Sequence, residues 1–450
     1  MWAGSRLPHV WIHGPFLIHY SRLYFRLNCR FSFSKSREDC DEFLPWLERK
    51  AGTEISSVLS IGTSCYGRSL FASKFIRDGD CILKVPFSVQ ITPDKLLPEI
   101  NCLLGDDVGY SARLAILILV EKKLGQDSRW HPYISRLPRP EELHSTIFWS
   151  KDELEMVQKS AIYHETINQK AQLEKEFLAI IPLDPVHGKV QRVYLWYHSY
   201  FLNHDGFSEA MLLSDEHEQI SEVIADRDYA PGEEVFIRYG KFPNATLLQD
   251  FGFTLPYNIH DQVQIWVDVP QRDPLHMMKL DLLHKHCAPT VPNTGSFNSF
   301  RTTFTIKEVR SASGKGKGIP QPLRAFARIS STTSVEELED LILEAAENDG
   351  RLARRPLKSK SKEIQAHQIL LLQLSRLIQE HEVSIKSLNL DETISVERLA
   401  IRAQMARDIL AGELRVLKSA STWLENYCAT LSAAKDHSWE LDTAIVDFEN

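Results

Sequence analysis

Three phrases that lie close together decide the fold of this chain: FLNHDG at residues 201–206, YAPGEEVFIRYG at residues 229–240 and NATLLQDFGF at residues 244–253. In the second phrase, Ala-Pro-Gly-Glu at 230–233 has the composition of a turn, and Val-Phe-Ile at 235–237 predicts a short buried strand. We therefore expect a hairpin over residues 224–239, and the short strands and turns together predict a mixed α+β domain.

Length and composition limit the classes of protein to which the chain can belong. Its 450 residues exceed the roughly 250–300 at which a single core stops growing, so two domains are expected. The formal net charge of −8 gives no basic footprint for nucleic acid. The longest apolar run, at residues 114–120, is far shorter than the ~20 residues of a membrane span. Seven cysteines without a CxxC pair suggest a reducing compartment and argue against a zinc site.

The first 37 residues are basic and contain no acidic side chain, with serines and aromatic residues between the charges. This composition is typical of an organelle transit peptide. The alternative is an unstructured basic terminus of a cytosolic protein. In either case we exclude residues 1–37 from the fold.

Hydrophobic patterns place several elements in the first half of the chain. Residues 41–50 form an amphipathic pattern with Phe43, Leu44 and Leu47 on one side. Strand signals at 70–72 and 81–86 flank the turn residues 77–80, which predicts a hairpin. Helices are expected at 111–124 and 151–178, with a proline-punctuated packed segment between them at 130–138.

The pattern becomes helical after a loop at residues 310–320 that is rich in Gly, Ser and Lys. Ser334 and Glu337 have the spacing of a capping box, for a helix that we expect to end at Gly350. Two long amphipathic helices are expected at 361–386 and 395–427. Their leucine spacing is too irregular for a coiled coil, so a compact helical domain is the better prediction.

The order of several motifs resembles a known family. They are YGRSLFASKFIRDGDCILKVP (66–86), WHPYISRLP (130–138), IFWSKDEL (147–154), FLNHDG (201–206), APGEEVFIRYG (230–240) and DFGF (250–253). Together they resemble the SET-domain methyltransferases of the subgroup that includes the plant Rubisco large-subunit lysine methyltransferase and the animal actin-histidine methyltransferase. The resemblance covers residues 43–428.

This resemblance implies an architecture. A SET domain with small β-sheets around a knot-like crossing and a helical insert is expected at 38–255, followed by a connector at 256–320. An all-α substrate-binding domain is expected at 321–430, with a tail at 431–450. The implied partner is a protein substrate docked by the C-terminal helices, and we expect a monomer that binds neither nucleic acid nor membrane.

The resemblance also implies a cofactor, S-adenosylmethionine, and a set of site residues. Tyr239 would be the catalytic tyrosine, and Phe251 would line the substrate channel at a position that is often tyrosine. A dry channel suits the chemistry, because a lysine with a reference pKa of about 10.4 must lose its proton before it can accept a methyl group. The implied cofactor-binding residues are Tyr66, Gly67, Arg68, Leu70, Asn203, His204 and Phe253, the last stacking on the adenine.

Two stretches depart from the family pattern. Gly67-Arg68-Ser69 stands where relatives have Gly-x-Gly. Residues 180–200, IIPLDPVHGKVQRVYLWYHSY, have Tyr200 where relatives have an aspartate, and the helical insert is short. Three explanations of this segment are open. An exon has been replaced, the chain is a divergent member that binds without catalysis, or Arg192 substitutes for a missing arginine.

Structural explanations compete with the functional ones at each position. The alternative at His204 is a satisfied buried histidine, and at Tyr239, Phe251 and Phe253 it is a core aromatic residue. The accompanying motifs favour the functional explanation at His204 and Tyr239. Lys315 and Lys317 in GKGKG lack the spacing of a phosphate loop and indicate a solvated linker.

Three functions therefore remain. The first is methylation of a lysine, or less readily a histidine, on an organellar protein, with the chloroplast favoured over mitochondrion and cytoplasm. The second is a catalytically impaired binding module, and the third is a helical interaction protein without a cofactor.

Overall fold

The computed structural model describes residues 42–64, 67–105, 108–138, 142–180, 203–205, 208–286, 302–311, 316–390 and 397–433. The chain forms two compact units. We call the first the sheet unit; it comprises Met1–Ile91, Arg129–Arg136 and Tyr200–Tyr239. The second, the helical unit, comprises Thr92–Ser128, Leu137–Ser199 and Gly240–Asn450.

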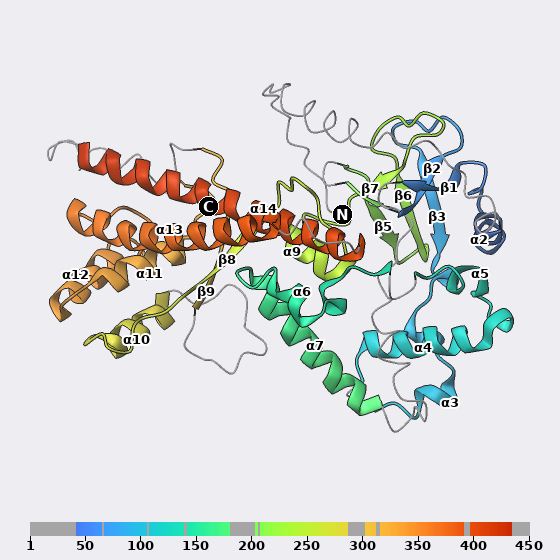
Figure 1. Ribbon diagram of the computed structural model, residues 1–450, viewed down its shortest axis with the longest axis horizontal. Coiled ribbons are helices and arrows are strands. Elements are labelled where there is room, and N and C mark those ends of the chain that lie inside the picture. The colour runs from blue at the N-terminus through green and yellow to red at the C-terminus, as the bar shows by residue number, and fades with distance from the viewer. Residues whose placement is uncertain are drawn as a thin grey trace, which may run out of the picture. The chain divides into compact units, whose positions relative to one another are not determined.

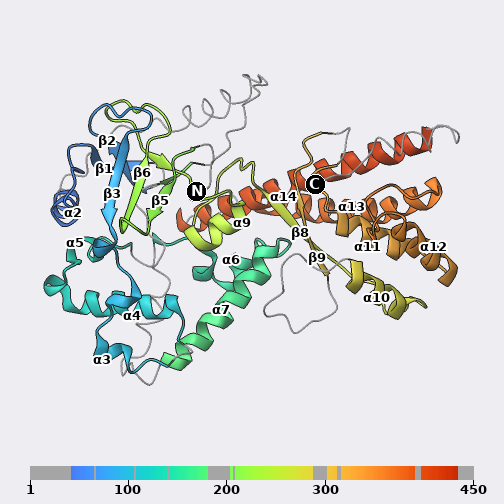
Figure 2. The same cartoon turned by 180° about the vertical axis from the view of Figure 1, so that it is seen from behind.

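Small sheets dominate the sheet unit, as the resemblance implied (Figure 1). A three-stranded antiparallel sheet has the order β3-β6-β5, and two-stranded sheets pair β1 with β2 and β4 with β7. Figure 2 shows the three-stranded sheet from its other side. The elements of this unit are α2 (Phe43–Ala51), β1 (Leu59–Ser64), β2 (Gly67–Ala72), β3 (Cys81–Pro86), η1 (Phe87–Val89), α5 (His131–Ile134), β4 (Asn203–His204), β5 (Leu212–Asp215), β6 (Ile220–Ile224) and β7 (Phe236–Ile237).

Both hairpins expected from the sequence are wrong in their pairing, although their turns and strands exist. The turn before β3 has Gly79 at φ 84°, yet β2 pairs with β1, and β3 pairs with β6. The turn before β7 has Gly232 at φ 83°, yet β7 pairs with β4 and not with β6. Glycine relieves the strain of a positive φ locally, but the strand partner is chosen by burial of side chains from distant segments.

The first helix follows the expected pattern, since α2 buries Phe43 and Leu44 and half-buries Leu47. It ends at Ala51 and is capped by Gly52, whose φ of 68° is left-handed and whose N–H donates to the Glu48 carbonyl at 2.8 Å. The helix packs on a core formed by strands β1 to β3, β6 and β7. Tyr239 also packs against this core and is partly buried, which places it at the edge of the core.

In the first part of the helical unit, helix α4 (Tyr110–Leu124) lies where it was expected. The second expected helix is interrupted, since α6 (Lys151–Glu155) and α7 (Ala161–Ile180) are separate. Ser150 begins α6 with a complete capping box, in which Ser150 Oγ accepts from Glu153 N–H and the Glu153 carboxylate accepts from Ser150 N–H. Shorter elements are η2 (Pro93–Lys95), α3 (Pro98–Asn101), η3 (Gly125–Asp127), η5 (Thr146–Phe148), α9 (Asn244–Thr246) and the π-helical turn η7 (Leu247–Phe251).

The C-terminal part is helical, as expected, and shares its core with a β-hairpin. The long helices α13 (Lys360–Leu390) and α14 (Glu397–Ala433) pack side by side (Figure 1). Strands β8 (Gln262–Val267) and β9 (Thr302–Lys307), in the stretch expected to be a connector, pair antiparallel and bury Ile265 and Ile306 in the same core. The other helices are α10 (His276–His286), α11 (Gln321–Ser331) and α12 (Val335–Ala346).

The start of α12 uses half of the expected capping box. Ser334 Oγ accepts from Glu337 N–H, but the Glu337 carboxylate accepts from Thr333 N–H at 2.7 Å, one residue earlier than the motif requires. The helix ends at Ala346 and not at Gly350, which lies in the following turn at φ 75°. In the described part of the chain, none of the helices has the length and apolar character needed to span a bilayer.

Candidate active site

A parallel strand pair within the sheet unit forms the centre of the candidate site. Asn203 pairs with Phe236 and His204 with Ile237. Asp205 N–H continues this pairing to the Ile237 carbonyl at 3.1 Å. Parallel strands require a long crossover connection, so the chain from β4 to β7 loops away through β5 and β6 before it returns beside its start.

His204 holds the backbone of Tyr239. Its Nδ1 accepts a hydrogen bond from Tyr239 N–H at 3.0 Å, and the two ring centroids are 5.2 Å apart. A ring nitrogen that accepts a hydrogen bond carries no proton, so this contact requires a neutral imidazole with its proton on Nε2. His204 is thus a buried, satisfied histidine whose partner is the expected catalytic residue.

Asn203, the first residue of β4, contacts both β2 and the segment that precedes β7. Its Nδ2 donates to Glu234 Oε1 at 3.2 Å and, at 3.5 Å, to the Arg68 carbonyl. Its amide oxygen accepts no hydrogen bond from the residues that the structure describes. Asn203, Glu234 and the Arg68 carbonyl therefore place several hydrogen-bond acceptors together, an arrangement suited to a cationic ligand group.

Strand β2 supplies Gly67, Arg68 and Leu70 to the same region. The Leu70 carbonyl accepts from Val235 N–H at 2.9 Å, which ties β2 to the residue directly before β7. The exposed Arg68 guanidinium donates to the Arg136 carbonyl at 2.9 Å. Ser69, which replaces a family glycine, is fully buried, and its hydroxyl has no hydrogen-bond partner among the described residues. A buried hydroxyl without a partner is costly, and it lies in the strand expected to contact the cofactor.

Asp226, which follows β6, joins the segment between β4 and β5 to the segment between β6 and β7. Its carboxylate accepts from Glu209 N–H at 2.7 Å, Tyr229 Oη at 2.8 Å and Ser208 Oγ at 3.0 Å. Burial alone would raise the pKa of Asp226, but these hydrogen bonds outweigh it and lower the pKa. The carboxylate therefore stays ionised and anchors the return of the chain to β7.

The aromatic pair expected at the channel and the adenine lies in the helical unit. Phe251 ends η7, stacks on Phe242 with centroids 6.0 Å apart, and lies 6.4 Å from Phe253. Gly252 between them has φ 78°, which allows the tight turn. The three rings form one aromatic group.

The sheet unit thus brings together Arg68, Leu70, Asn203, His204 and Tyr239. Tyr66 and all of the divergent segment 180–200 except its first residue lie outside the described residues. Sequence reasoning missed Glu234 and Ser69. The sequence signal for Glu234 was its position directly before the expected strand. The signal for Ser69 was that it replaces a family glycine. Within the described ranges, no group of three His, Cys, Asp or Glu residues could hold a metal ion.

Comparison with known proteins agrees with this geometry. The family model described as "SET domain" matches residues 67–240, which span β2 to the residue after Tyr239. Residues 67–240 form a SET domain. The domain belongs to a family of S-adenosylmethionine-dependent methyltransferases that includes lysine and histidine methyltransferases, as its relatives below illustrate.

Three curated relatives illustrate the range of this SET-domain family. Ribosomal lysine N-methyltransferase 4 of Saccharomyces cerevisiae is 28% identical over 34% of this chain and 33% of its own length. Actin-histidine N-methyltransferase of Homo sapiens is 22% identical over 86% of this chain and 69% of its own length. The chloroplastic Rubisco large subunit N-methyltransferase of Pisum sativum is 30% identical over 31% of this chain and 28% of its own length. The matches to the yeast and pea proteins thus span about a third of those relatives or less.

A solved structure extends the match to the whole fold. The structure of Rubisco LSMT bound to AdoMet aligns with a TM-score of 0.65 and 20% identity over 92% of this chain and 97% of that chain. At this identity the match establishes the fold: a SET domain combined with a largely helical C-terminal part. The expected fold class is therefore confirmed.

Proposed function

We propose that this SET-domain protein transfers a methyl group from S-adenosylmethionine to a lysine side chain of an organellar protein, with Tyr239 as the catalytic residue. The observation that carries the proposal is the hydrogen bond from Tyr239 N–H to His204 Nδ1 beside the β4–β7 pair. It fixes the position of the Tyr239 backbone by a buried partner and not by a mobile loop.

The residues of the sheet unit fit the cofactor. When bound, S-adenosylmethionine supplies the methyl group. The amide oxygen of Asn203 and the Glu234 carboxylate would accept hydrogen bonds from its ammonium group, and the Arg68 guanidinium would face its carboxylate. The buried Ser69 hydroxyl, which lacks a partner among the described residues, is a further polar contact for the cofactor. Tyr66 and Gly67 would contribute backbone groups, and Phe253 a face for the adenine.

The tyrosine hydroxyl would orient the acceptor nitrogen toward the methyl group. Transfer requires a neutral amine, so the lysine ammonium loses a proton before attack, and the methylammonium product loses another only before it accepts a second methyl group. Tyr239 need not take either proton. Its role is alignment in a site where correct geometry alone contributes most of the rate.

Histidine is the second candidate acceptor. It is favoured by the actin-histidine methyltransferase, whose match covers 86% of this chain. A binding module without turnover is the third candidate, and the divergent segment 180–200 is the reason to test it. We place the activity in the chloroplast on the acid-free basic composition of residues 1–37 and the chloroplastic pea relative. Fusion of residues 1–60 to a fluorescent protein in leaf cells tests that assignment.

Calorimetric titration of S-adenosylmethionine, followed by transfer of labelled methyl groups to leaf stromal protein, tests the function. Asn203→Ala should weaken cofactor binding roughly tenfold or more, because it removes a hydrogen bond to a charged group. Tyr239→Phe should keep the cofactor affinity but lower kcat by roughly 10²–10³-fold, as for removal of a transition-state contact. Tyr110→Phe, at an exposed tyrosine of α4, is the matched control.

Hydrolysis of the labelled protein then distinguishes methyl-lysine from methyl-histidine. A folded chain that binds no S-adenosylmethionine would refute the enzymatic function and leave the binding module.

A further inference from the structure

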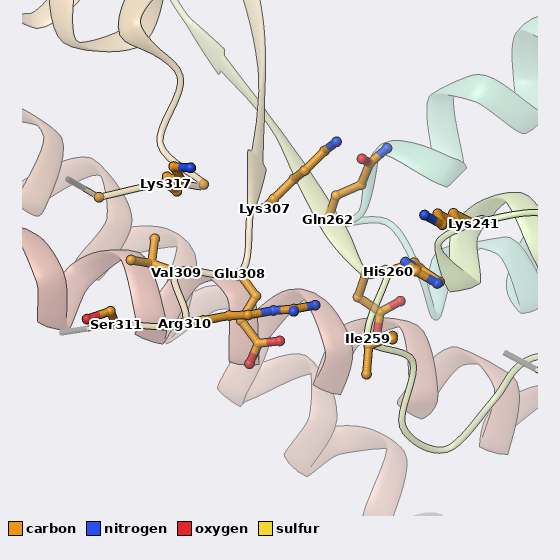
Figure 3. A pocket seen from close by; sticks show the side chains of 13 residues that line it. Lys241, Ile259, His260, Gln262, Lys307, Glu308, Val309, Arg310, Ser311 and Lys317 are labelled. Carbon is orange, nitrogen blue, oxygen red and sulfur yellow. The ribbon is translucent and has the colours of Figure 1, made fainter. Parts of the chain in front are cut away.

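The helical unit contains a cavity of about 610 Å³ at one end of the β8–β9 hairpin, which we call the basic pocket. Pairing of Gln262 with Lys307 brings two of its walls together, and the third comes from residue 241 (Figure 3). The pocket is lined by Lys241, Ile259, His260, Asp261, Gln262, Lys307, Glu308, Val309, Arg310, Ser311, Gly316, Lys317 and Gly318.

Four exposed cations surround this pocket: Lys241, Lys307, Arg310 and Lys317. Their side chains make no ion pair or hydrogen bond within the part of the chain that the structure describes. Elsewhere in the unit an exposed cation can have an acidic partner; Lys285, also exposed, contacts Asp281 at 2.8 Å. The four charges are therefore available to an external ligand.

The two acidic residues of the lining are already occupied. Arg415 lies 3.3 Å from Asp261 Oδ2 and, through Nε, 3.4 Å from Glu308 Oε1. Burial raises the pKa of Asp261 to about 7, although hydrogen bonds from Asn244 N–H and Arg415 oppose the shift. Whether Asp261 is ionised and paired or partly neutral, the pocket keeps a surplus of positive charge.

This surplus does not follow from composition, because the chain as a whole has a formal net charge of −8. In physiological salt the screening length is about 8 Å, so a bound anion responds to the local cations and not to the distant acidic surface. The ligand of the basic pocket is therefore anionic.

The arrangement of the cations indicates a polypeptide. Lysine ammonium groups on separate segments suit carboxylates spread along a chain, whereas a single small anion is held by converging backbone N–H groups or a bidentate arginine. Ile259 and the buried Val309 add apolar surface for side chains. Apart from His260 the lining has no aromatic ring, so it lacks the stacking surface used for single-stranded nucleic acid.

We propose that the basic pocket docks an acidic segment of the protein that accepts the methyl group. The inference rests on the proposed function for the identity of the partner, but the charge recognition can be measured without any turnover. Recognition of a further segment of the substrate gives specificity that a generic methyl-transfer site lacks.

A fluorescein-labelled decapeptide of glutamate and leucine serves as the probe, with fluorescence anisotropy of the full chain as the readout at 50 and 200 mM salt. We expect saturable binding that weakens with salt and falls at least tenfold in Lys307→Glu/Arg310→Glu. Lys307→Gln/Arg310→Gln should give an intermediate loss of peptide affinity. This neutral variant serves as the test if the charge-reversed variant does not fold. Lys123→Glu/Lys386→Glu applies the same change in net charge at exposed sites of α4 and α13, and should change affinity less than twofold.

Equal losses in the pocket variants and in this control would overturn the proposal, as would absence of peptide binding. Tighter binding of poly(U) or of inorganic phosphate than of the peptide, with the same dependence on Lys307 and Arg310, would also overturn it. With S-adenosylmethionine binding measured in parallel, peptide binding without cofactor binding would refute the enzymatic function and leave the pocket intact.

Discussion

Glu413 lies at the centre of a buried cluster that joins three parts of the helical unit, and its replacement by glutamine gives a sharp prediction. From α14, its carboxylate accepts from Ser160 Oγ at 2.6 Å, in the segment between α6 and α7. It also contacts Nε2 of His381, on α13, at 2.9 Å. His381 Nδ1 lies 2.8 Å from the Leu377 carbonyl, so both ring nitrogens face acceptors. The geometry therefore requires an imidazolium paired with the carboxylate.

The magnitude follows from burial, since His381 is 1% and Glu413 5% exposed. Removal of one partner of a buried ion pair typically costs about 3–5 kcal/mol, because the other charge or its proton is left without compensation. In Glu413→Gln the ion pair is lost: at pH 6 the buried imidazolium either stays without a counter-charge or gives up its proton, so that the neutral ring accepts from the amide NH2 group. We expect the free energy of unfolding to fall by about that amount at pH 6.

The deficit should depend on pH in a definite direction. Burial alone would lower the pKa of His381, but the hydrogen bond and charge of Glu413 outweigh it, and the pKa is raised above its ordinary value of 6.5. A raised folded pKa gives stability that is fully present below pH 6.5 and is lost as the pH rises through the folded pKa. The loss has a slope of up to about 1.4 kcal/mol per pH unit. The difference between the native chain and Glu413→Gln should therefore shrink from pH 6 to pH 9.

Urea unfolding followed by tryptophan fluorescence at several pH values measures both effects. The matched control is Glu382→Gln, because Glu382 and Lys418 also join α13 and α14, at 2.7 Å, but are exposed to solvent. The control should have a much smaller effect that does not vary between pH 6 and pH 9. The reasoning is refuted if both variants lose the same stability, or if Glu413→Gln and the native chain change in parallel with pH.

Two further substitutions test the packing of the helical unit. Trp423 is 1% exposed, stacks on Tyr427 with centroids 5.0 Å apart and lies under the Arg324 guanidinium. Trp423→Ala should cost about 3–5 kcal/mol in urea unfolding, whereas Leu372→Ala, at a side chain 76% exposed on α13, should change stability by less than about 0.5 kcal/mol; similar losses would contradict the core assignment. Gly252→Ala and Gly350→Ala both place a Cβ at a positive φ, at a cost of about 1–2 kcal/mol. Only the first would meet a neighbour, the Ser145 nitrogen at 3.0 Å, so it should be the more destabilising by thermal denaturation; equal costs would mean that Ser145 moves freely.

Local sequence patterns predicted the elements whose formation depends on nearby residues. The apolar spacing of residues 41–50 and 111–124 indicated α2 and α4, and Gly79 and Gly232 indicated turns that the structure contains. The motif order also implied the SET fold that the comparisons establish. These predictions succeeded because helix periodicity and turn conformation are set within a few residues.

The tertiary structure alone decided which segments meet. Strand β2 pairs with β1, and β4 pairs with β7. Asn203 contacts Glu234, and Glu413 forms a cluster with Ser160 and His381. Each of these contacts joins residues that are distant in sequence or lie on different elements. The hairpin of β8 and β9 was missed because its strands are 34 residues apart between Val267 and Thr302, beyond the reach of a turn signal. The partner of a strand or of a buried charge is selected by the burial and hydrogen bonding of the complete fold, and a local stretch of sequence does not contain that information.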